Sequence, residues 1–354
     1  MEAYFLLLIF VIALIFFQDI YGAVYISLFG RKYDIIPIVT YIVFLVFYAI
    51  RDYIGYDYAM YYKTVEGGYA DDVYASKGEY ISAGLLDIAN YFNDPHVYFF
   101  LTAAISLACI VYACHKFINL KSGLGWGMLV FLALPVGFLY TLSTQRQFVA
   151  IGIMMLGIRY LREKRFFSFT GITILATMAH ISSCFCWLLF FIQSKRINKK
   201  ILAIIGALGF FLASKATFLV AIFFPFYMAY IEMAIGASGG GTSQFILYII
   251  ILLISIVSYY FVREKETYNF FLKNYMFGFT LMAIFFPFDA SVSFRLGGFA
   301  LLNAIFLIPL WCDAFSGIPK IFFKCALVLA LSFVYYYGLI TTVDDFYIPY
   351  KTFL

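Results

Sequence analysis

The sequence predicts an all-α integral membrane protein with about 11 to 12 transmembrane helices. Of its 354 residues, 65% are hydrophobic and only 12% are charged, and the mean hydropathy is +0.95. Soluble domains carry roughly 25% charged residues. Apolar runs near the length that crosses a bilayer recur along the whole chain, so we expect a single transmembrane domain over residues 1–354.

The apolar runs predict the membrane spans in order. The first, 3–17, has neither the basic start nor the small-residue cleavage site of a signal peptide, so it predicts a retained span. Several runs are short for a bilayer, which indicates local thinning or part-buried helices. The other predicted spans are 35–50, 97–115, 124–142, 148–161, 201–213, 244–262, 275–288, 296–312 and 321–340.

Residues 166–192 form either one long helix or a helical hairpin that turns near His180, and the basic residues decide between the two. Lys and Arg collect in cytoplasmic loops. A single helix would place the basic cluster 195–200 opposite the cluster 159–165, whereas a hairpin keeps both clusters on the inner side. The hairpin is therefore expected, with both ends of the sequence outside.

Two predicted loops lie on the outer face. Loop 51–95 contains eight acidic residues, three basic residues and many tyrosines. Carboxylates accept hydrogen bonds from hydroxyls and aromatic rings offer apolar faces, so this content suits a carbohydrate site. The alternative is an interfacial aromatic belt on a solvated acidic loop. Loop 214–243 contains Gly239-Gly240-Gly241, which predicts a flexible cover over the site.

A cluster of ionisable and aromatic residues directly follows the apolar run 35–50. Charged groups at membrane depth are costly, and they usually pair with each other or with a charged ligand. We expect Arg51 to hold phosphate or to fix Asp52, and the acids and tyrosines after it to bind sugar. The candidate substrate-binding residues are Arg51, Asp52, Asp57, Tyr58, Tyr61, Tyr62 and Gln147.

Three arginines stand apart from the inner basic clusters, at the outer ends of predicted spans: Arg51, Arg146 and Arg295. Arginine is permanently charged and can donate two hydrogen bonds to phosphate oxygens. Arginines that converge at the outer surface would suit a lipid-linked diphosphate. The alternative is that each one reaches the lipid headgroups or pairs with a nearby acid, such as Asp52 or Asp289.

His180, at the outward turn of the predicted hairpin, is the candidate general base, because histidine titrates near neutral pH. The alternative is a buried histidine that makes a local hydrogen bond, with Asp57 and Asp52 as competing bases. The sequence has no His/Cys cluster with metal-ligand spacing and no glycine-rich phosphate loop. We therefore expect no metal, no cofactor and no nucleic-acid partner.

The motif Arg51-Asp52-x-x-Gly55-x-Asp57-Tyr58-x-x-Tyr61 resembles the signature of EpsG-like proteins, a branch of the Wzy-type bacterial polysaccharide polymerases. Arg146-Gln147 at the start of a span and His180 about a span later fit the same order. The segment Tyr347-Ile348-Pro349-Tyr350-Lys351 resembles the family's short closing motif. The likeness runs from roughly residue 33 to 351, and residues 201–274 carry nothing that matches.

The resemblance implies a GT-C-like glycosyltransferase of the bacterial plasma membrane with an active site that faces the periplasm or exterior. Such enzymes join oligosaccharide repeat units, carried on undecaprenyl diphosphate, into O-antigen, capsule or exopolysaccharide, with inversion and without metal. Arg146 and Arg295 would then stabilise the diphosphate leaving group, and His180 would deprotonate the acceptor hydroxyl. Besides the lipid bilayer, a chain-length regulator and a repeat-unit flippase are the implied partners.

Two functions of other classes are weighed against the polymerase. A flippase or transporter of lipid-linked oligosaccharide should show internal repeats and charges along a central path, but the sequence shows no repeat. A membrane sugar O-acyltransferase needs a cytoplasmic acyl-donor site, for which the sequence offers no candidate residues. A ligase that attaches polymer to a lipid core is a close relative of the polymerase, and the sequence separates the two poorly.

Overall fold

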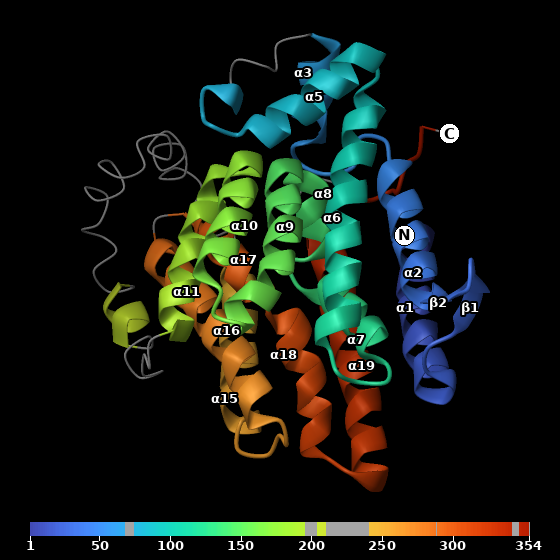
Figure 1. Cartoon of the computed structure of the whole chain (residues 1–354), viewed down its shortest axis with the longest axis vertical. Coiled ribbons are helices and arrows are strands. Elements are labelled where there is room, and N and C mark those ends of the chain that lie inside the picture. Colours follow the sequence, from blue (N-terminus) through green and yellow to red (C-terminus); the bar gives the residue numbers. More distant parts are fainter. Residues whose placement is uncertain (68–73, 195–203, 210–240, 288, 342–346, 354) are drawn as a thin grey trace. The chain divides into compact units, whose positions relative to one another are not determined.

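The computed structural model describes residues 1–67, 74–194, 204–209, 241–287, 289–341 and 347–353. Over these residues the chain is helical apart from one two-stranded antiparallel sheet, which confirms the all-α prediction (Figure 1). The chain divides into two compact units. Unit 1 comprises residues 1–159, 167–184 and 316–354, and unit 2 comprises residues 160–166 and 185–315.

Most of the helices belong wholly or mainly to unit 1. In chain order they are α1 (Glu2–Tyr21), α2 (Ile35–Ala49), α3 (Tyr58–Glu66), α5 (Tyr80–Phe92), α6 (Pro95–Phe117), α7 (Gly123–Ala133), α8 (Phe138–Ser143), α9 (Gln145–Arg162), α10 (Phe166–Ala179) and α19 (Gly317–Thr341). The strands β1 (Tyr25–Leu28) and β2 (Arg31–Asp34) connect α1 to α2, and the short 3-10 helix η1 (Ile181–Cys186) follows α10.

Unit 2 contains the helices that lie between η1 and α19. Over the described residues they include α11 (Trp187–Ser194), α15 (Thr242–Ser258), α16 (Lys265–Phe285), α17 (Ala290–Leu301), α18 (Ala304–Leu310) and the 3-10 helix η3 (Trp311–Ala314). The helices α16 and α17 form the main contact of this unit. The predicted span 201–213 and the predicted loop 214–243 lie largely outside the described residues.

Carboxylates fix the starts of several helices. The first backbone N–H groups of a helix have no partner within the helix, so a preceding acidic side chain that accepts from them is stabilising. Asp34 accepts from the backbone of Ile36 at 3.1 Å, and Asp289 accepts from Val292 at 2.6 Å. Asp94 does the same for α6, where Pro95 occupies the first helical position that proline favours.

Three of the described helices are long and apolar enough to cross a membrane: α1, α6 and α19. The pair Ala290–Leu301 and Ala304–Ala314, bent by 56°, would make a fourth. The chain is therefore a multi-pass membrane protein, as predicted. Shorter apolar helices coincide with other predicted spans, and the total of 11 to 12 spans stays a prediction. These shorter helices are Ile35–Ala49, Gly123–Ala133, Phe166–Ala179, Ile181–Gln193 and Thr242–Ser258.

Some predicted segments are divided differently in the structure. The predicted span 124–142 is two helices, α7 and α8, and the predicted loop 51–95 is largely helical where it is described, because it contains α3 and α5. In the predicted hairpin 166–192, the ring of Phe166 lies 5.1 Å from that of Phe190. A straight helix would separate these two residues by about 36 Å, so the chain turns back on itself between them.

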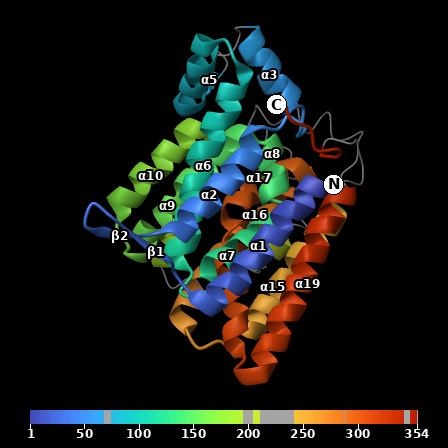
Figure 2. The ribbon, with the colours of Figure 1, turned by 90° about the vertical axis from the view of Figure 1, so that its right-hand side faces the viewer.

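Small residues allow the helices of unit 1 to pack closely, as is common in membrane helix bundles. Gly152 of α9 meets α6 so closely that a Cβ atom there would lie 2.9 Å from the Cα atom of Ser106. Gly125 of α7 likewise lies against Ile15 of α1. Helices α1 and α19 run side by side, and Asp19 pairs with Lys324 at 2.7 Å between them (Figure 2).

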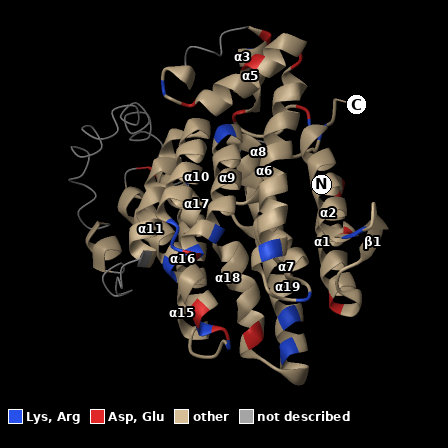
Figure 3. Cartoon of the chain, in the orientation of Figure 1, with Lys and Arg blue, Asp and Glu red and all other residues tan. Residues whose placement is uncertain are grey.

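The two ends of unit 1 differ in charge. Figures 1 and 2 show α3 and α5 together at one end, which we call the α3–α5 end. Acidic residues gather there, whereas basic residues occupy the far ends of α6 and α19 (Figure 3). The charge pattern that the sequence predicts for loop 51–95 is therefore a property of one end of the folded unit.

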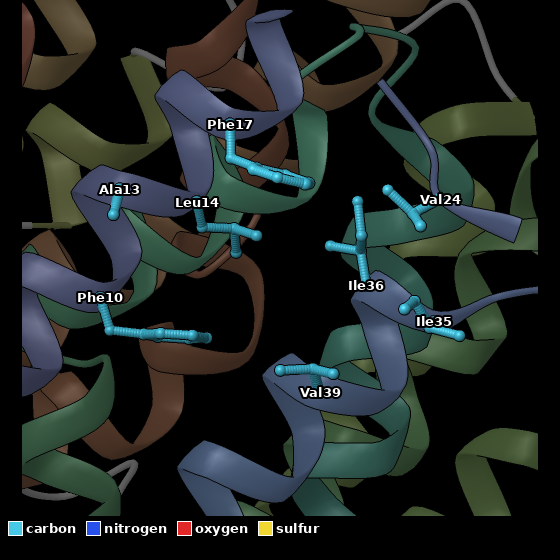
Figure 4. A pocket seen from close by; sticks show the side chains of 8 residues that line it. All are labelled: Phe10, Ala13, Leu14, Phe17, Val24, Ile35, Ile36 and Val39. Atoms are coloured by element: carbon cyan, nitrogen blue, oxygen red, sulfur yellow. The ribbon is translucent and has the colours of Figure 1, made fainter. Parts of the chain in front are cut away.

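An apolar cavity of about 330 Å³ lies between α1 and α2 (Figure 4). Every side chain around it is a hydrocarbon, so the cavity offers nothing that would bind a sugar or a phosphate. The lining residues are Phe10, Ala13, Leu14, Phe17, Val24, Ile35, Ile36 and Val39.

The close contact of α9 with α6 gives the first prediction. Gly152→Leu should destabilise the protein by about 1–3 kcal/mol, because the added side chain must displace the backbone at Ser106. The measurement is the temperature at which the detergent-solubilised protein loses its monodisperse state. Gly171→Leu is the matched control, since a side chain on this helical glycine meets open space. Equal melting temperatures for the two variants would contradict the packing.

Candidate functional site

Arg51 is completely buried at the α3–α5 end of unit 1. Its guanidinium donates to the carbonyl oxygens of Tyr48 at 2.7 Å, Ile54 at 3.1 Å and Leu142 at 3.4 Å. It also lies 3.8 Å from the ring of Tyr48 and 5.0 Å from that of Phe99. Carbonyl dipoles and aromatic faces thus stabilise the buried charge. Arg51 thereby ties the end of α2 to residues on two other segments.

Gly55 explains why the motif requires glycine at this position. Its φ is +106°, a conformation that residues with a side chain rarely adopt, and a Cβ atom would lie 2.3 Å from the carbonyl oxygen of Leu142. This close approach allows the backbone N–H of Tyr56 to donate to Ser143 Oγ at 2.8 Å. The motif is therefore docked on the last residues of α8.

Residues 347–353, which we call the C-terminal strap, lie against the same motif. The backbone N–H of Asp52 donates to the carbonyl of Lys351 at 3.0 Å, and that of Phe353 donates to the carbonyl of Ile50 at 3.2 Å. The hydroxyl of Tyr347 lies 2.9 Å from Ser143 Oγ. The two motifs that carry the family resemblance are therefore neighbours in the structure.

The motif tyrosines lie at different depths. Tyr58 is buried and stacks on Phe99 with ring centroids 4.2 Å apart, and its hydroxyl donates to the Asp52 carboxylate at 3.4 Å. Burial raises the pKa of Tyr58, so this hydroxyl stays protonated and acts as a donor at neutral pH. Tyr62 is half-buried beside Tyr53. Asp57, also half-buried, directly precedes α3.

Arg146, in the first turn of α9, has a side chain that is 14% exposed. Its Nη1 atom forms an ion pair with Glu79, its Nε atom donates to the Tyr61 hydroxyl at 3.3 Å, and its guanidinium lies 4.2 Å from the ring of Tyr74. Burial raises the pKa of Tyr74 to about 12, an effect that the nearby Arg146 opposes. Nη2 of Arg146 makes no hydrogen bond to any residue in the described part of the chain.

Glu79 is the residue that assembles this site. Its side chain is only 2% exposed and immediately precedes α5. One carboxylate oxygen accepts from Arg146, and the other accepts from the backbone N–H of Ile181 at 3.0 Å. A second tie comes from Ser82 of α5, which donates to the carbonyl of Ala179 at 2.6 Å. Together these contacts fix α5 on both the start of α9 and the turn after α10.

His180 lies in that turn and is buried, with 5% of its surface exposed. Its Nδ1 atom is 2.7 Å from Ser182 Oγ and 3.3 Å from the backbone nitrogen of Ser182. The backbone N–H of Ser182 donates to Nδ1, whereas the Ser182 hydroxyl can donate to Nδ1 or accept from it. Because these contacts engage Nδ1, a proton exchanged with a ligand would use Nε2.

Unit 1 thus brings together Tyr61, Arg146 and His180, with Arg51, Asp52 and Tyr58 in the adjoining motif. Gln147 is buried next to Arg146 in α9. Arg295 lies in α17 of unit 2 and is half-buried. Over the described residues, no three His, Cys, Asp or Glu side chains gather as a metal site would require.

Glu79 is absent from the residues that the sequence singled out. It is one of eight acids in the predicted loop 51–95, and nothing in its spacing distinguishes it from the others. The only sequence signal is its place directly before an apolar-patterned stretch, which becomes α5. Its partners, Arg146 and Ile181, are distant in the sequence, so only the fold reveals the pairing.

This arrangement can bind an oxyanion and exchange a proton. A fixed guanidinium with an exposed edge attracts phosphate oxygens, and a nearby imidazole can accept a proton from a hydroxyl.

A family model described as the EpsG family matches residues 34–352, which is most of the chain. No curated protein and no solved structure matches the chain.

The docking of the motif gives a second prediction. Gly55→Ala should detach the segment around residues 51–66, because the new methyl group collides with the Leu142 carbonyl and the backbone conformation becomes strained. The measurement is the rate of trypsin cleavage after Lys63 in membrane vesicles, which should rise several-fold. Gly78→Ala carries a similar strain, at φ +77°, but meets open space. Equal cleavage in both variants would show that the contact with Leu142 does not hold the motif.

Proposed function

The chain belongs to the EpsG family, and on this premise we propose that it is a glycosyltransferase that joins lipid-linked oligosaccharide repeat units into a long surface polysaccharide. Family membership by itself indicates a polysaccharide-polymerase type of function in a multi-pass membrane protein. The observation that carries the finer proposal is the placement of Arg146, held by Glu79 and Tyr61, beside the turn that contains His180.

The proposed reaction transfers the growing glycan from its lipid diphosphate to a hydroxyl at the non-reducing end of a new lipid-linked unit. The acceptor oxygen forms a bond to the anomeric carbon, and the bond from that carbon to the phosphate oxygen breaks. The electron pair of the broken bond stays on the diphosphate, which remains on its lipid. A direct displacement of this kind inverts the anomeric centre.

Arg146 is the group that would stabilise the leaving diphosphate. Its position is fixed on one side by Glu79 and Tyr61, and its Nη2 atom makes no hydrogen bond within the described chain. A preorganised cation that meets charge as it develops lowers the barrier by about 3–4 kcal/mol in comparable oxyanion sites. Arg295 is the second candidate for this role, and Gln147 follows Arg146 on α9. Fixed arginine charge would serve here in place of a metal ion.

His180 would take the proton of the acceptor hydroxyl on Nε2. For this role the ring would carry its own proton on Nδ1 and donate it to Ser182 Oγ at 2.7 Å, in place of the longer contact at 3.3 Å from the Ser182 backbone N–H. Asp52 and Asp57 are the competing bases, but the Asp52 carboxylate already accepts from Tyr58. We assign sugar binding to Asp57 and Tyr62, and we assign the buried Tyr61 to holding Arg146. We assign Arg51 to the support of the motif, because its donors point to carbonyl oxygens.

The family resemblance supports the remaining parts of the proposal. The donor and acceptor would be carried on undecaprenyl diphosphate, and the site would face the outer side of a bacterial plasma membrane. The fold would be GT-C-like. A repeat-unit flippase would supply the substrate and a chain-length regulator would set the size of the product. The acidic α3–α5 end of unit 1 agrees with an outer position, since basic residues favour the cytoplasmic side.

Arg146 gives the central test. Arg146→Ala should slow polymerisation by at least about 100-fold, because the leaving group loses its fixed cation. The measurement is the length distribution of the glycan from cells in which the variant is the only copy. Long polymer should be lost while lipid-linked single repeats accumulate on the outer face.

The control is Arg165→Ala, which removes an exposed arginine between α9 and α10, at the opposite end of α9 from Arg146. It should leave the length distribution unchanged. Polymer of normal length with Arg146→Ala would contradict the proposal. If the glycan from Arg146→Ala has normal length but lacks an acyl group that the unchanged protein adds, the protein would instead be an O-acyltransferase. Single repeats that stay on the inner face would indicate a flippase, and free long polymer that is not attached to a lipid core would indicate a ligase.

His180 gives a separate test of the proton transfer. His180→Asn should lower kcat by about 100-fold or more with little change in KM for the donor, because the ring acts on the acceptor hydroxyl rather than on the diphosphate. The measurement is polymer formation from purified lipid-linked repeats as a function of donor concentration. His115→Asn is the control, since His115 lies in the last turn of α6, whereas the α3–α5 end of unit 1 adjoins the first turn of that helix. An unchanged kcat in His180→Asn would transfer the role of base to Asp52 or Asp57.

A further inference from the structure

We propose that Glu79 is a positioning residue that holds Arg146 and the His180 turn in one fixed arrangement. The inference rests on the proposed function and concerns the same site. Glu79 itself is 2% exposed and has both carboxylate oxygens engaged, so it acts on a ligand through its two neighbours.

The two neighbours of Glu79 require a carboxylate. Arg146 presents an N–H donor to one oxygen, and the backbone of Ile181 presents an N–H donor to the other. Only an ionised carboxylate accepts on both sides. A glutamine of the same shape has one oxygen and one NH₂ group, so one of the two donors would face another donor. The site therefore depends on the charge state and on the second oxygen of Glu79, as well as on its volume.

The contacts of Glu79 also leave one edge of Arg146 for a ligand. Glu79 engages Nη1, Tyr61 engages Nε, and Tyr74 covers the guanidinium plane at 4.2 Å. The guanidinium cannot rotate without the loss of these contacts, so Nη2 keeps one direction. Because arginine side chains are otherwise flexible, this restraint removes much of the entropy cost of binding a diphosphate.

The same carboxylate connects the guanidinium to the candidate base. Ile181 directly follows His180, and its backbone N–H donates to a carboxylate oxygen of Glu79 at 3.0 Å. The Ser82 hydroxyl holds the other side of this turn through the carbonyl of Ala179 at 2.6 Å. The start of α5 thereby sets the position of the imidazole relative to Arg146. A displacement of about 1 Å between two reacting groups can cost about 100-fold in rate.

The first test measures the arrangement without any reaction. Hydrogen exchange is followed by mass spectrometry on the full chain in detergent, for peptides that cover residues 176–187. In Glu79→Ala the turn should exchange at least about tenfold faster, because the Ile181 amide loses its acceptor. Asp87→Asn, an exposed carboxylate on the same helix, is the control and should match the unchanged protein. Unchanged exchange in Glu79→Ala would overturn the proposal.

The second test separates positioning from a general loss of folded protein. Glu79→Gln should lower kcat for polymer formation by about 100-fold, and Glu79→Asp, which keeps both acceptor oxygens, should recover part of that loss. Since Glu79 acts through Arg146, the double variant Glu79→Gln/Arg146→Lys should be no slower than the slower single variant. Multiplied losses, or no recovery with Glu79→Asp, would show that Glu79 only supports the fold and would overturn the proposal.

The two tests distinguish a failure of this inference from a failure of the proposed function. If the unchanged protein forms polymer and Glu79→Gln forms it equally fast, the positioning role is wrong and the polymerase proposal stands. If the unchanged protein forms no polymer from lipid-linked repeats, the polymerase proposal is wrong. In that case the exchange measurement still decides whether Glu79 holds the turn.

Discussion

An ionised side chain that is removed from water must be compensated, and this constraint shapes the α3–α5 end of unit 1. The chain meets it in two ways. Arg51 is surrounded by three carbonyl oxygens and by aromatic rings, so its charge interacts with groups of the protein itself. Arg146 is compensated by one carboxylate and keeps an exposed edge. Arg51 therefore supports the local structure, whereas Arg146 is a cation that a ligand can reach.

The sequence identified both arginines, but it could not distinguish their roles. Each one lies at the end of an apolar run, and the cost of its burial is the same in both places. The difference comes from the partners, Leu142 for Arg51 and Glu79 for Arg146, and these contacts span long stretches of chain. Charge patterning was enough to predict the acidic end, because it depends on composition alone. The pairing within that end depends on how the helices pack.

The helical membrane class also followed from composition, whereas the division into helices did not. An apolar run of suitable length is compatible with one helix or two, and Leu134–Gly137 interrupts the run 124–142 between α7 and α8. The predicted loop 51–95 contains α3 and α5, whose apolar residues pack on α6. Helix α3 places Tyr61 toward Arg146, and the start of α5 places Glu79 there. Their burial against α6 is a tertiary effect that hydropathy along the chain does not show.

The C-terminal strap sets the order in which the protein can become active during its synthesis. Its Tyr350 hydroxyl donates to the carbonyl of Phe47, 303 positions earlier in the chain. At the usual rates of translation, about 5–20 residues per second, those residues leave the ribosome about 15–60 s apart. For that time the Arg51 motif lacks the strap's backbone partners. The Arg51 motif is therefore completed only after the helices that precede the strap have been synthesised.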